Sequence, residues 1–204
     1  MMTALLLCAL AAAPAADAHQ LAARVQATYE RTHDLESRFV QTYTYATFGR
    51  SQVSRGVLEV KKPGKMRWQY EEPARKTVVV NGSRLVQYEP EANQAYVDEH
   101  FDASAMSAAV AFLLGKGKLE KEFEPSLGEG GELILTPRRG DGRVARIGLR
   151  LDEAGDVIAT RVVDGSGNVN EVRFEGVRRN VGLKDSDFEL RLPKDVQRIA
   201  PPAR

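Results

Sequence analysis

Short stretches of alternating apolar and polar residues, separated by turn residues, recur through most of this 204-residue chain. The clearest stretch is 65–70, in which Met66, Trp68 and Tyr70 share one face and charged or amide side chains take the other. About ten such segments, with turns every 8–12 residues or so, are typical of an antiparallel barrel or sandwich and not of βαβ units. We therefore expect a mainly β fold.

The other predicted strands share this alternation or are rich in β-branched residues. They span residues 35–45, 53–62, 77–80, 85–88, 94–97, 132–136, 144–151, 157–163, 169–177 and 188–192. Pro63-Gly64 predicts a turn, and Asn81-Gly82 is the strongest hairpin signal. Asp164, Ser166 and Asn168 are spaced somewhat like a calcium loop, but no bidentate acid closes the loop, so we predict a plain hairpin turn.

Two segments have the period of a helix. Residues 20–33 place Leu21, Val25 and Tyr29 on one stripe. Residues 103–114 are rich in alanine and stop before a glycine, with Met106, Val110 and Leu113 on one stripe.

The first eighteen residues are typical of an export signal. An apolar run over 4–13 is followed by Ala16-Asp17-Ala18, a small-x-small pattern cut after its last residue. The run is shorter than the roughly 20 residues that span a bilayer, so no transmembrane helix is predicted. Cleavage after Ala18 would leave one domain, residues 19–204, and would remove Cys8, so the mature protein would have no disulfide.

Side chains for catalysis or metal binding are sparse. The three histidines, His19, His33 and His100, are scattered, and no cysteine survives processing, so we predict no metal site. No serine lies in a nucleophile-elbow motif, and we predict no catalytic residue. The 29 basic and 28 acidic residues nearly balance, which argues against nucleic acid as a partner. The chain reads as a binding protein and not as an enzyme.

Several segments match, in order and spacing, the motifs of one family. The chain resembles the outer-membrane lipoprotein carrier family, LolA, over nearly all of its length after the export signal. The matching motifs are Phe39-Val40-Gln41, residues 56–63 (GVLEVKKP), residues 66–70 (MRWQY) followed by Pro73, residues 79–82 (VVNG), residues 85–90 (LVQYEP), and residues 187–190 (DFEL) followed by Pro193.

The resemblance implies an incomplete, curved antiparallel β-barrel, a half-barrel whose α-helical lid encloses a hydrophobic cavity. It implies a monomeric periplasmic shuttle with no cofactor. Such a shuttle takes triacylated lipoproteins from an inner-membrane ABC-type release complex (LolCDE-like) and passes them to an outer-membrane acceptor (LolB-like). Burying a methylene group is worth about 0.8 kcal/mol, so acyl chains cross water only when shielded.

With this resemblance, the apolar faces become candidates for the lipid-binding lining. From periodicity alone they would simply fill a closed core, because most apolar strand faces do. The predicted lining residues are Phe39, Leu58, Val60, Met66 and Trp68 on strands, and Met106, Val110 and Leu113 on the second helix.

Lys62 shares a strand face with Leu58 and Val60. The family commonly has an arginine here that holds the lid of the empty carrier closed, which makes Lys62 a candidate lid latch. A lysine lacks the planar five-donor fork of arginine, so its latch would be looser, or mediated by water. The alternative is an ordinary solvated lysine at the end of a strand.

Two other functions remain open at this point. One is a periplasmic lipid- or lipoprotein-sensing regulatory domain with the same half-barrel, as in RseB-type regulators, although these usually add a second domain. The other is a periplasmic hydrolase of lipid-like substrates, which the missing nucleophile–histidine arrangement disfavours.

Overall fold

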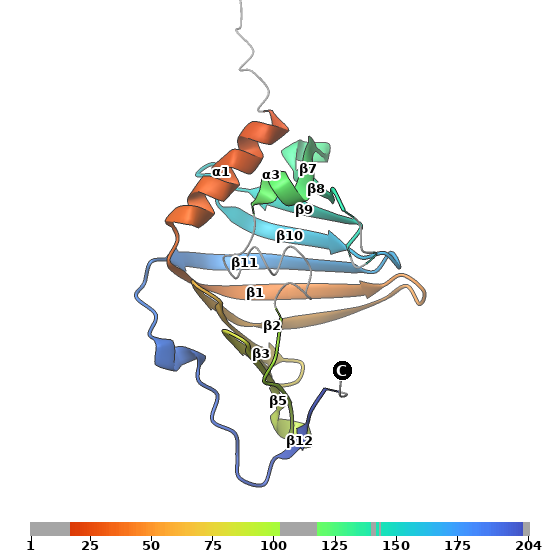
Figure 1. Cartoon of the computed structure of the whole chain (residues 1–204). Helices are drawn as coiled ribbons and strands as arrows, with labels where there is room; N and C mark the ends of the chain where they lie inside the picture. The colour runs from red at the N-terminus through yellow and green to blue at the C-terminus, as the bar shows by residue number, and fades with distance from the viewer. Residues whose placement is uncertain (1–16, 103–117, 140–141, 143, 202–204) are drawn as a thin grey trace, which may run out of the picture.

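One continuous sheet dominates the computed structural model, which describes residues 17–102, 118–139, 142 and 144–201. Its order is β12-β6-β5-β4-β3-β2-β1-β11-β10-β9-β8-β7, so β12 and β7 are free edges and the sheet stays open. Neighbouring strands are antiparallel, except that β12 runs parallel to β6. Figure 1 shows the sheet curving from β7–β9 through the central β11, β1 and β2 to β3 and β5. The predicted mainly β, incomplete and curved antiparallel barrel is confirmed.

The elements have the following bounds. The strands are β1 (Asp34–Tyr45), β2 (Arg50–Lys61), β3 (Lys65–Glu72), β4 (Lys76–Asn81), β5 (Arg84–Glu89), β6 (Gln94–Asp98), β7 (Phe123–Leu127), β8 (Leu133–Pro137), β9 (Arg146–Leu151), β10 (Val157–Val163), β11 (Val169–Arg179) and β12 (Gln197–Ile199). The helices are α1 (Ala18–Arg31) and α3 (Leu119–Glu122), with 3-10 turns η1 (Pro90–Ala92), η3 (Glu129–Gly131) and η4 (Asp185–Phe188).

The predicted turns are confirmed. Gly82 takes a left-handed φ of 63° in the tight turn between β4 and β5, and Gly64 a φ of 69° between β2 and β3. Asp164 closes the β10–β11 turn, because its backbone N–H donates to the Asn168 carbonyl at 3.0 Å. Its carboxylate accepts bonds from Ser166 and Asn168 of the same turn. This segment is therefore a hairpin turn, as its sequence predicts.

The strand predicted over 188–192 is wrong. The 3-10 turn η4 ends at Phe188, and the chain then forms no strand pairing until β12, with one turn at residues 194–195 on the way. Phe188 and Leu190 instead pack against Val79 and Val86, around a pocket of about 260 Å³ on the face of β4 and β5 opposite to Val80 and Leu85. A segment that lies across a sheet alternates in the same way as a strand that joins its edge, so the sequence pattern did not separate the two.

Two edge elements were not predicted. The strand β7 contains Pro125, which cannot donate a ladder hydrogen bond but is tolerated in the middle of β7 because β7 is an edge strand. The strand β12 has three residues and is exposed throughout, so it has no apolar face to reveal it. The short helix α3, before β7, was also missed.

The first helix begins two residues earlier than predicted and ends at Arg31. Asp17 caps it, accepting a hydrogen bond from the His19 backbone at 3.0 Å. Its buried face packs on the β7–β9 end of the sheet and on α3, as Figure 1 shows. The second predicted helix, 103–114, lies outside the described residues. Within the described ranges, no helix has the length and apolar character to cross a bilayer.

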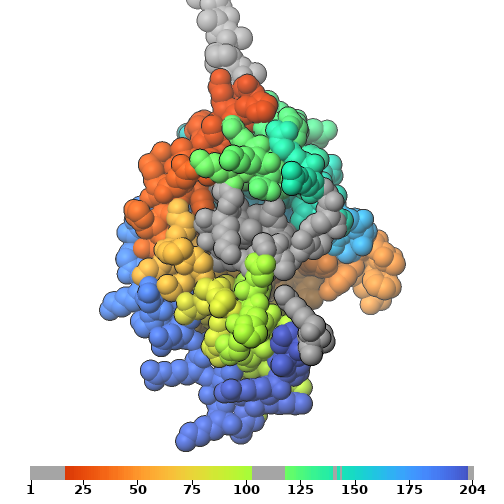
Figure 2. All heavy atoms as spheres, viewed as in Figure 1, coloured from red at the N-terminus to blue at the C-terminus, as the bar shows by residue number. Residues whose placement is uncertain are grey.

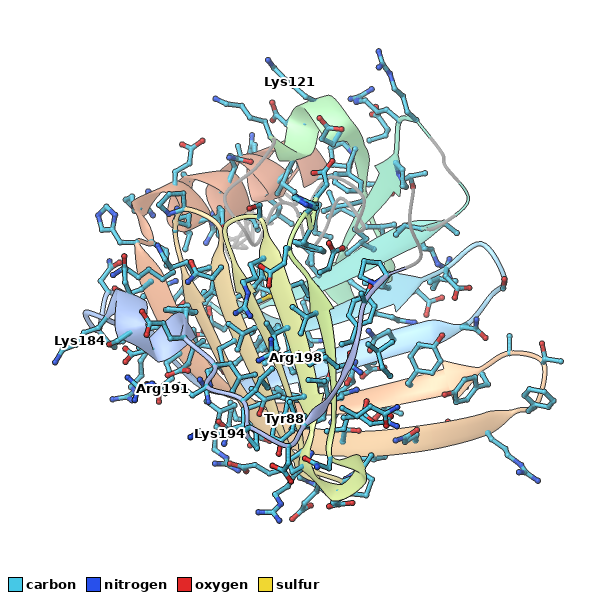
Figure 3. The ribbon with its side chains drawn as sticks, turned by 60° about the horizontal axis from the view of Figure 1, so that its bottom comes forward. Tyr88, Lys121, Lys184, Arg191, Lys194 and Arg198 are labelled. Carbon is cyan, nitrogen blue, oxygen red and sulfur yellow. The ribbon has the colours of Figure 1, made fainter. Side chains whose placement is uncertain are left out.

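The carboxyl-terminal segment, residues 184–198, wraps the outside of the sheet. Asp185 anchors its start by ion pairs with Lys61 and Lys65, at 2.7 and 3.3 Å. Figure 2 shows this segment in blue, below the yellow and green strands. Figure 3 labels Lys184, Arg191, Lys194 and Arg198 along its course.

Candidate functional site

An apolar cluster covers the inner face of the sheet, defined here as the face that carries Phe39. Strand register builds it in rows: Leu35, Val60, Met66, Val80 and Leu85 are successive cross-strand partners from β1 to β5. Because alternate residues share a face, the neighbouring row through Ser37, Leu58 and Trp68 lies on the same side. The inner cluster contains Leu35, Phe39, Leu58, Val60, Met66, Trp68, Tyr70, Val80, Leu85, Phe101, Val172 and Phe174.

The five predicted lining residues on strands all belong to this cluster. Phe39, Leu58, Val60 and Met66 are buried, and Trp68 is half-buried. The other three, Met106, Val110 and Leu113, lie outside the described residues. The alternation of β2 and β3 was enough to find the strand positions, whereas Val80, Val172 and Phe174 join through strand pairings that single segments do not reveal.

Three aromatic rings form the centre of the cluster. The centroid of the Phe39 ring lies 5.0 Å from that of Trp68 and 5.3 Å from that of Tyr70, and the second pair meets edge to face. Burial raises the pKa of the Tyr70 hydroxyl to about 12, against a smaller opposing effect of its hydrogen bond with Gln41. Among the described residues, no acceptor lies within hydrogen-bond distance of the buried indole nitrogen of Trp68.

Gly56 makes room for this centre. A Cβ at this position would lie 1.9 Å from the Gln69 carbonyl oxygen and 3.0 Å from the Phe39 ring. The β2–β3 register shifts beside it, between Arg55 and Gly56. Only glycine permits β2, β3 and the Phe39 ring to approach so closely.

A second apolar cluster continues the same face toward β7. Leu133 pairs with Leu149, and Leu149 pairs with Thr160, which in turn pairs with Val172 of the inner cluster. Helix α1 covers this end with Ala18, Ala22 and Val25. The inner face is therefore largely apolar from β5 to β7, with polar exceptions such as Ser37 and Thr160, and α1 closes one end of it.

Lys62 links this helix to the strands. Its ammonium donates hydrogen bonds to the Tyr29 carbonyl at 2.5 Å and the Glu30 carbonyl at 3.4 Å, and lies 4.3 Å from the centroid of the Tyr29 ring. Burial lowers the pKa of the Lys62 ammonium, while the Glu30 carboxylate opposes this shift. These contacts replace the expectation of a purely solvated lysine with a lysine that caps the carboxyl end of α1.

The described residues offer little reactive chemistry. No group of three or more His, Cys, Asp or Glu side chains within them could hold a metal ion. His33 is exposed, and its backbone carbonyl accepts a hydrogen bond from the Lys62 N–H at 2.9 Å. The apolar inner face of the sheet can shield apolar groups of a ligand from water.

An open, curved antiparallel sheet with an apolar inner face and a helix across one end defines a half-barrel protein. Comparison with known proteins agrees. The profile of the family described as outer membrane lipoprotein carrier protein LolA matches residues 30–191, most of the chain. The chain belongs to this LolA family.

Individual relatives support the same assignment. The outer-membrane lipoprotein carrier protein of Alkalilimnicola ehrlichii is 30% identical over 174 residues, which cover 84% of this chain and 79% of that protein. The protein of the same name from Dechloromonas aromatica is 29% identical over 170 residues, 80% of each chain. An uncharacterized conserved protein from Thermus thermophilus shares the fold, with a TM-score of 0.53 at 12% identity over 90% of this chain and 99% of that one.

Proposed function

We propose that this protein is a periplasmic carrier that shields the acyl chains of lipoproteins on their way to the outer membrane. The observation that carries the proposal is the inner cluster, which unites all five predicted strand residues on one sheet face in a member of the LolA family. Relatives that cover most of the chain bear the name outer-membrane lipoprotein carrier protein. A carrier needs such a face because each acyl chain costs several kcal/mol to expose to water.

In this proposal the acyl chains lie along Phe39, Leu58, Val60, Met66 and Trp68. Met106, Val110 and Leu113, which lie outside the described residues, are proposed members of the same lining. The thioether of Met66 adapts to chains of different shape. The unpartnered Trp68 N–H is available to a carbonyl oxygen at the head of an acyl chain.

The proposed latch is the contact between Lys62 and the end of α1. The ammonium holds two backbone carbonyls of the last turn, so a shift of α1 away from β2 would break both hydrogen bonds. Acyl chains that displace α1 or its neighbours would have to overcome this contact. The empty state is thereby favoured, which assists release of the cargo.

The amino-terminal segment is proposed to be an export signal that is cleaved after Ala18. The mature protein would then be one domain, residues 19–204, in the periplasm. Cleavage at this point removes Asp17, which caps α1, and Ala18, which is the buried first residue of the helix. Helix α1 of the mature protein would therefore be held by its packing and by Lys62 more than by its amino-terminal cap.

The proposed partners are triacylated lipoproteins, an inner-membrane ABC-type release complex and an outer-membrane acceptor. The carrier acts as a monomer, without catalysis or a cofactor of its own. Binding and release are driven by the balance between apolar burial and the contacts of the empty state.

The test is to incubate the purified protein with spheroplasts and to measure triacylated lipoprotein in the soluble fraction. We expect a soluble one-to-one complex. Lipoprotein that binds but is not released from the membrane would favour the sensing domain, and cleaved acyl chains would favour a hydrolase. Trp68→Ser, on the inner face, is expected to abolish release, while Val57→Ser, on the opposite face of β2, is the matched control.

A further inference from the structure

The tip of the β1–β2 hairpin, residues 43–53, carries exposed apolar side chains. Phe48 is 73% exposed, Val53 43% and Tyr45 41%, so this tip holds three of the six large hydrophobic side chains that are exposed in the described part of the chain. Single exposed hydrophobic residues are ordinary, but several on one protruding element indicate an interaction surface. Figure 2 shows the tip in orange, projecting at the right edge of the molecule beside the blue β10–β11 turn.

Beyond its base, the hairpin is also free of acidic side chains. Residues 37–58 contain no Asp or Glu but three arginines, Arg38, Arg50 and Arg55, although 28 of the 204 residues are acidic. Arg38 and Arg55 pair with Glu71 and Glu72 of β3. Arg50, at the tip, is exposed and forms no ion pair with any residue that the structure describes. The outermost part of the hairpin therefore combines apolar and aromatic side chains with a positive charge that no described acid neutralises.

The tip is held in place and is not a loose loop. Tyr45 pairs with Arg50 at the end of the ladder, and the Tyr45 carbonyl accepts a hydrogen bond from Gly49 at 2.9 Å. Asn168 of the β10–β11 turn accepts a hydrogen bond from the Ala46 backbone at 3.0 Å. These hydrogen bonds hold the turn in one conformation, and that conformation exposes Phe48 to solvent.

One acidic side chain that acts electrostatically on the hairpin, through Tyr43, belongs to that same neighbouring turn. Asp164 is engaged by three hydrogen bonds from Ser166 and Asn168, which lower its pKa. The Asp164 carboxylate thus accepts hydrogen bonds within its own turn, and it forms no ion pair with Arg50 in the described structure.

We propose that this tip docks the protein on the surface of a phospholipid bilayer that carries anionic headgroups. Aromatic rings with a polar edge and arginines on apolar stems are the side chains that occupy the interfacial layer of a membrane. The acid-free tip favours a negatively charged surface. A second copy of the same tip is a poor partner, because it would bring the two Arg50 charges together.

The tip is connected to the inner cluster by a row of side chains along β1, so docking would bring this row to the membrane surface. Phe39, Gln41, Tyr43 and Tyr45 alternate along β1 on the inner face, and the rings of Tyr43 and Tyr45 meet with centroids 4.7 Å apart. A row of side chains that is aromatic except at Gln41 thus leads from the inner cluster to the tip. Figure 3 shows this hairpin extending past its neighbours, on the side away from Lys184 and Arg191.

The docking itself does not depend on the proposed cargo and is tested without any. The protein, purified as the cell processes it, is mixed with vesicles of phosphatidylcholine with or without phosphatidylglycerol, and vesicle-bound protein is measured by sedimentation. We expect weak, salt-sensitive binding that is stronger on the anionic vesicles. One cation near an anionic surface contributes about 1 kcal/mol, so Arg50→Ser should weaken binding to anionic vesicles about fivefold and leave neutral vesicles unaffected.

Phe48→Ser should weaken binding to both kinds of vesicle. Leu127→Ser, at an exposed apolar residue (46% exposed) on the far edge strand β7, is the matched control and should bind normally. Circular dichroism of each variant checks its fold. All variants have the same amino-terminal segment, so that segment cannot cause a difference in vesicle binding between them. Absence of vesicle binding, equal loss in the Leu127 variant, or binding that ignores both Phe48 and Arg50 would overturn the proposal. A dimer that depends on Phe48 would assign the tip to a second copy instead and would also overturn it.

Discussion

The Lys62 ammonium donates a hydrogen bond to the backbone carbonyl of Tyr29 at 2.5 Å and lies over the ring of the same residue. The two residues are 33 positions apart in the sequence, and the contact joins the turn after β2 to the last turn of α1. Carbonyls in a last turn lack intrahelical donors, and the negative end of the helix dipole favours a cation. Lys62 therefore fastens the helix to the sheet beside the inner cluster.

Replacing this lysine tests the latch. Lys62→Leu should bind acylated lipoprotein at least as well as the unmodified protein but pass it to the acceptor poorly, because the empty state loses its fastening. A partly exposed charge-assisted contact is worth about 1 kcal/mol, so we expect a change of about fivefold in the transfer equilibrium. The measurement is a two-step assay, with release from spheroplasts followed by transfer to the acceptor.

Lys61→Leu is the control for this variant. Lys61 is the preceding residue, but its ammonium contacts the Leu183 carbonyl and Asp185 on the outer segment and not α1. It should transfer cargo normally. Unchanged transfer by the Lys62 variant would remove the latch role.

Tyr70 predicts a loss of stability at alkaline pH. Its pKa is raised to about 12 in the folded protein from 10.0 in the unfolded chain, so the unfolded chain loses this proton first as pH rises. The contribution is fully present below about pH 10 and is lost progressively toward pH 12, and two pKa units correspond to about 2–3 kcal/mol. Urea unfolding at the two ends of this window should show that the decline is smaller in Tyr70→Phe. An equal decline in both proteins would contradict the assignment.

Gly56→Ala should destabilise the protein strongly. The added methyl group would overlap the Gln69 carbonyl oxygen and press on the Phe39 ring, so β2 and β3 must separate in the middle of the inner cluster. We expect a loss of at least about 2 kcal/mol in the free energy of unfolding. Gly82→Asn, in an open left-handed turn, should cost less than about 1 kcal/mol. Similar costs at the two positions would show that the close approach at Gly56 is unimportant.

The amino-terminal cap can be tested by chain length. A protein that begins at Asp17 should be more stable than one that begins at His19, because the Asp17 side chain caps α1. The cap is worth about 1 kcal/mol, or about 2–4 °C in Tm for a domain of this size. Thermal unfolding of the two proteins measures the difference, and mass spectrometry of the protein purified from cells tests the proposed cleavage after Ala18. Identical Tm values would mean that packing alone fixes the start of α1.

Features set by neighbouring residues were predictable from the sequence. The alternation of Met66, Trp68 and Tyr70 identified the inner face of β3, and Asn81-Gly82 identified the hairpin turn that follows β4. The sequence motifs in these strands also identified the LolA family correctly.

Features that depend on contacts between residues far apart in the sequence were not predictable from it. Nothing near Lys62 in the sequence indicates that the end of α1 will meet it, and the contribution of Val172 depends on the pairing of β11 with β1. The segment after Phe188 alternates like a strand, yet it lies across the face of β4 and β5. Pro125 concealed an edge strand because proline inside a short segment is normally a sign against a strand.

The central claim, that the inner cluster binds acyl chains, can be tested through the single tryptophan of the protein. Trp68 lies within the cluster, so its fluorescence reports on what enters there. The protein is titrated with a triacylated lipopeptide that carries bromine on its acyl chains, since bromine quenches tryptophan emission only at contact. The account predicts saturable quenching that an unbrominated lipopeptide reverses by competition. Lipopeptide binding without quenching would place the acyl chains elsewhere and contradict the account.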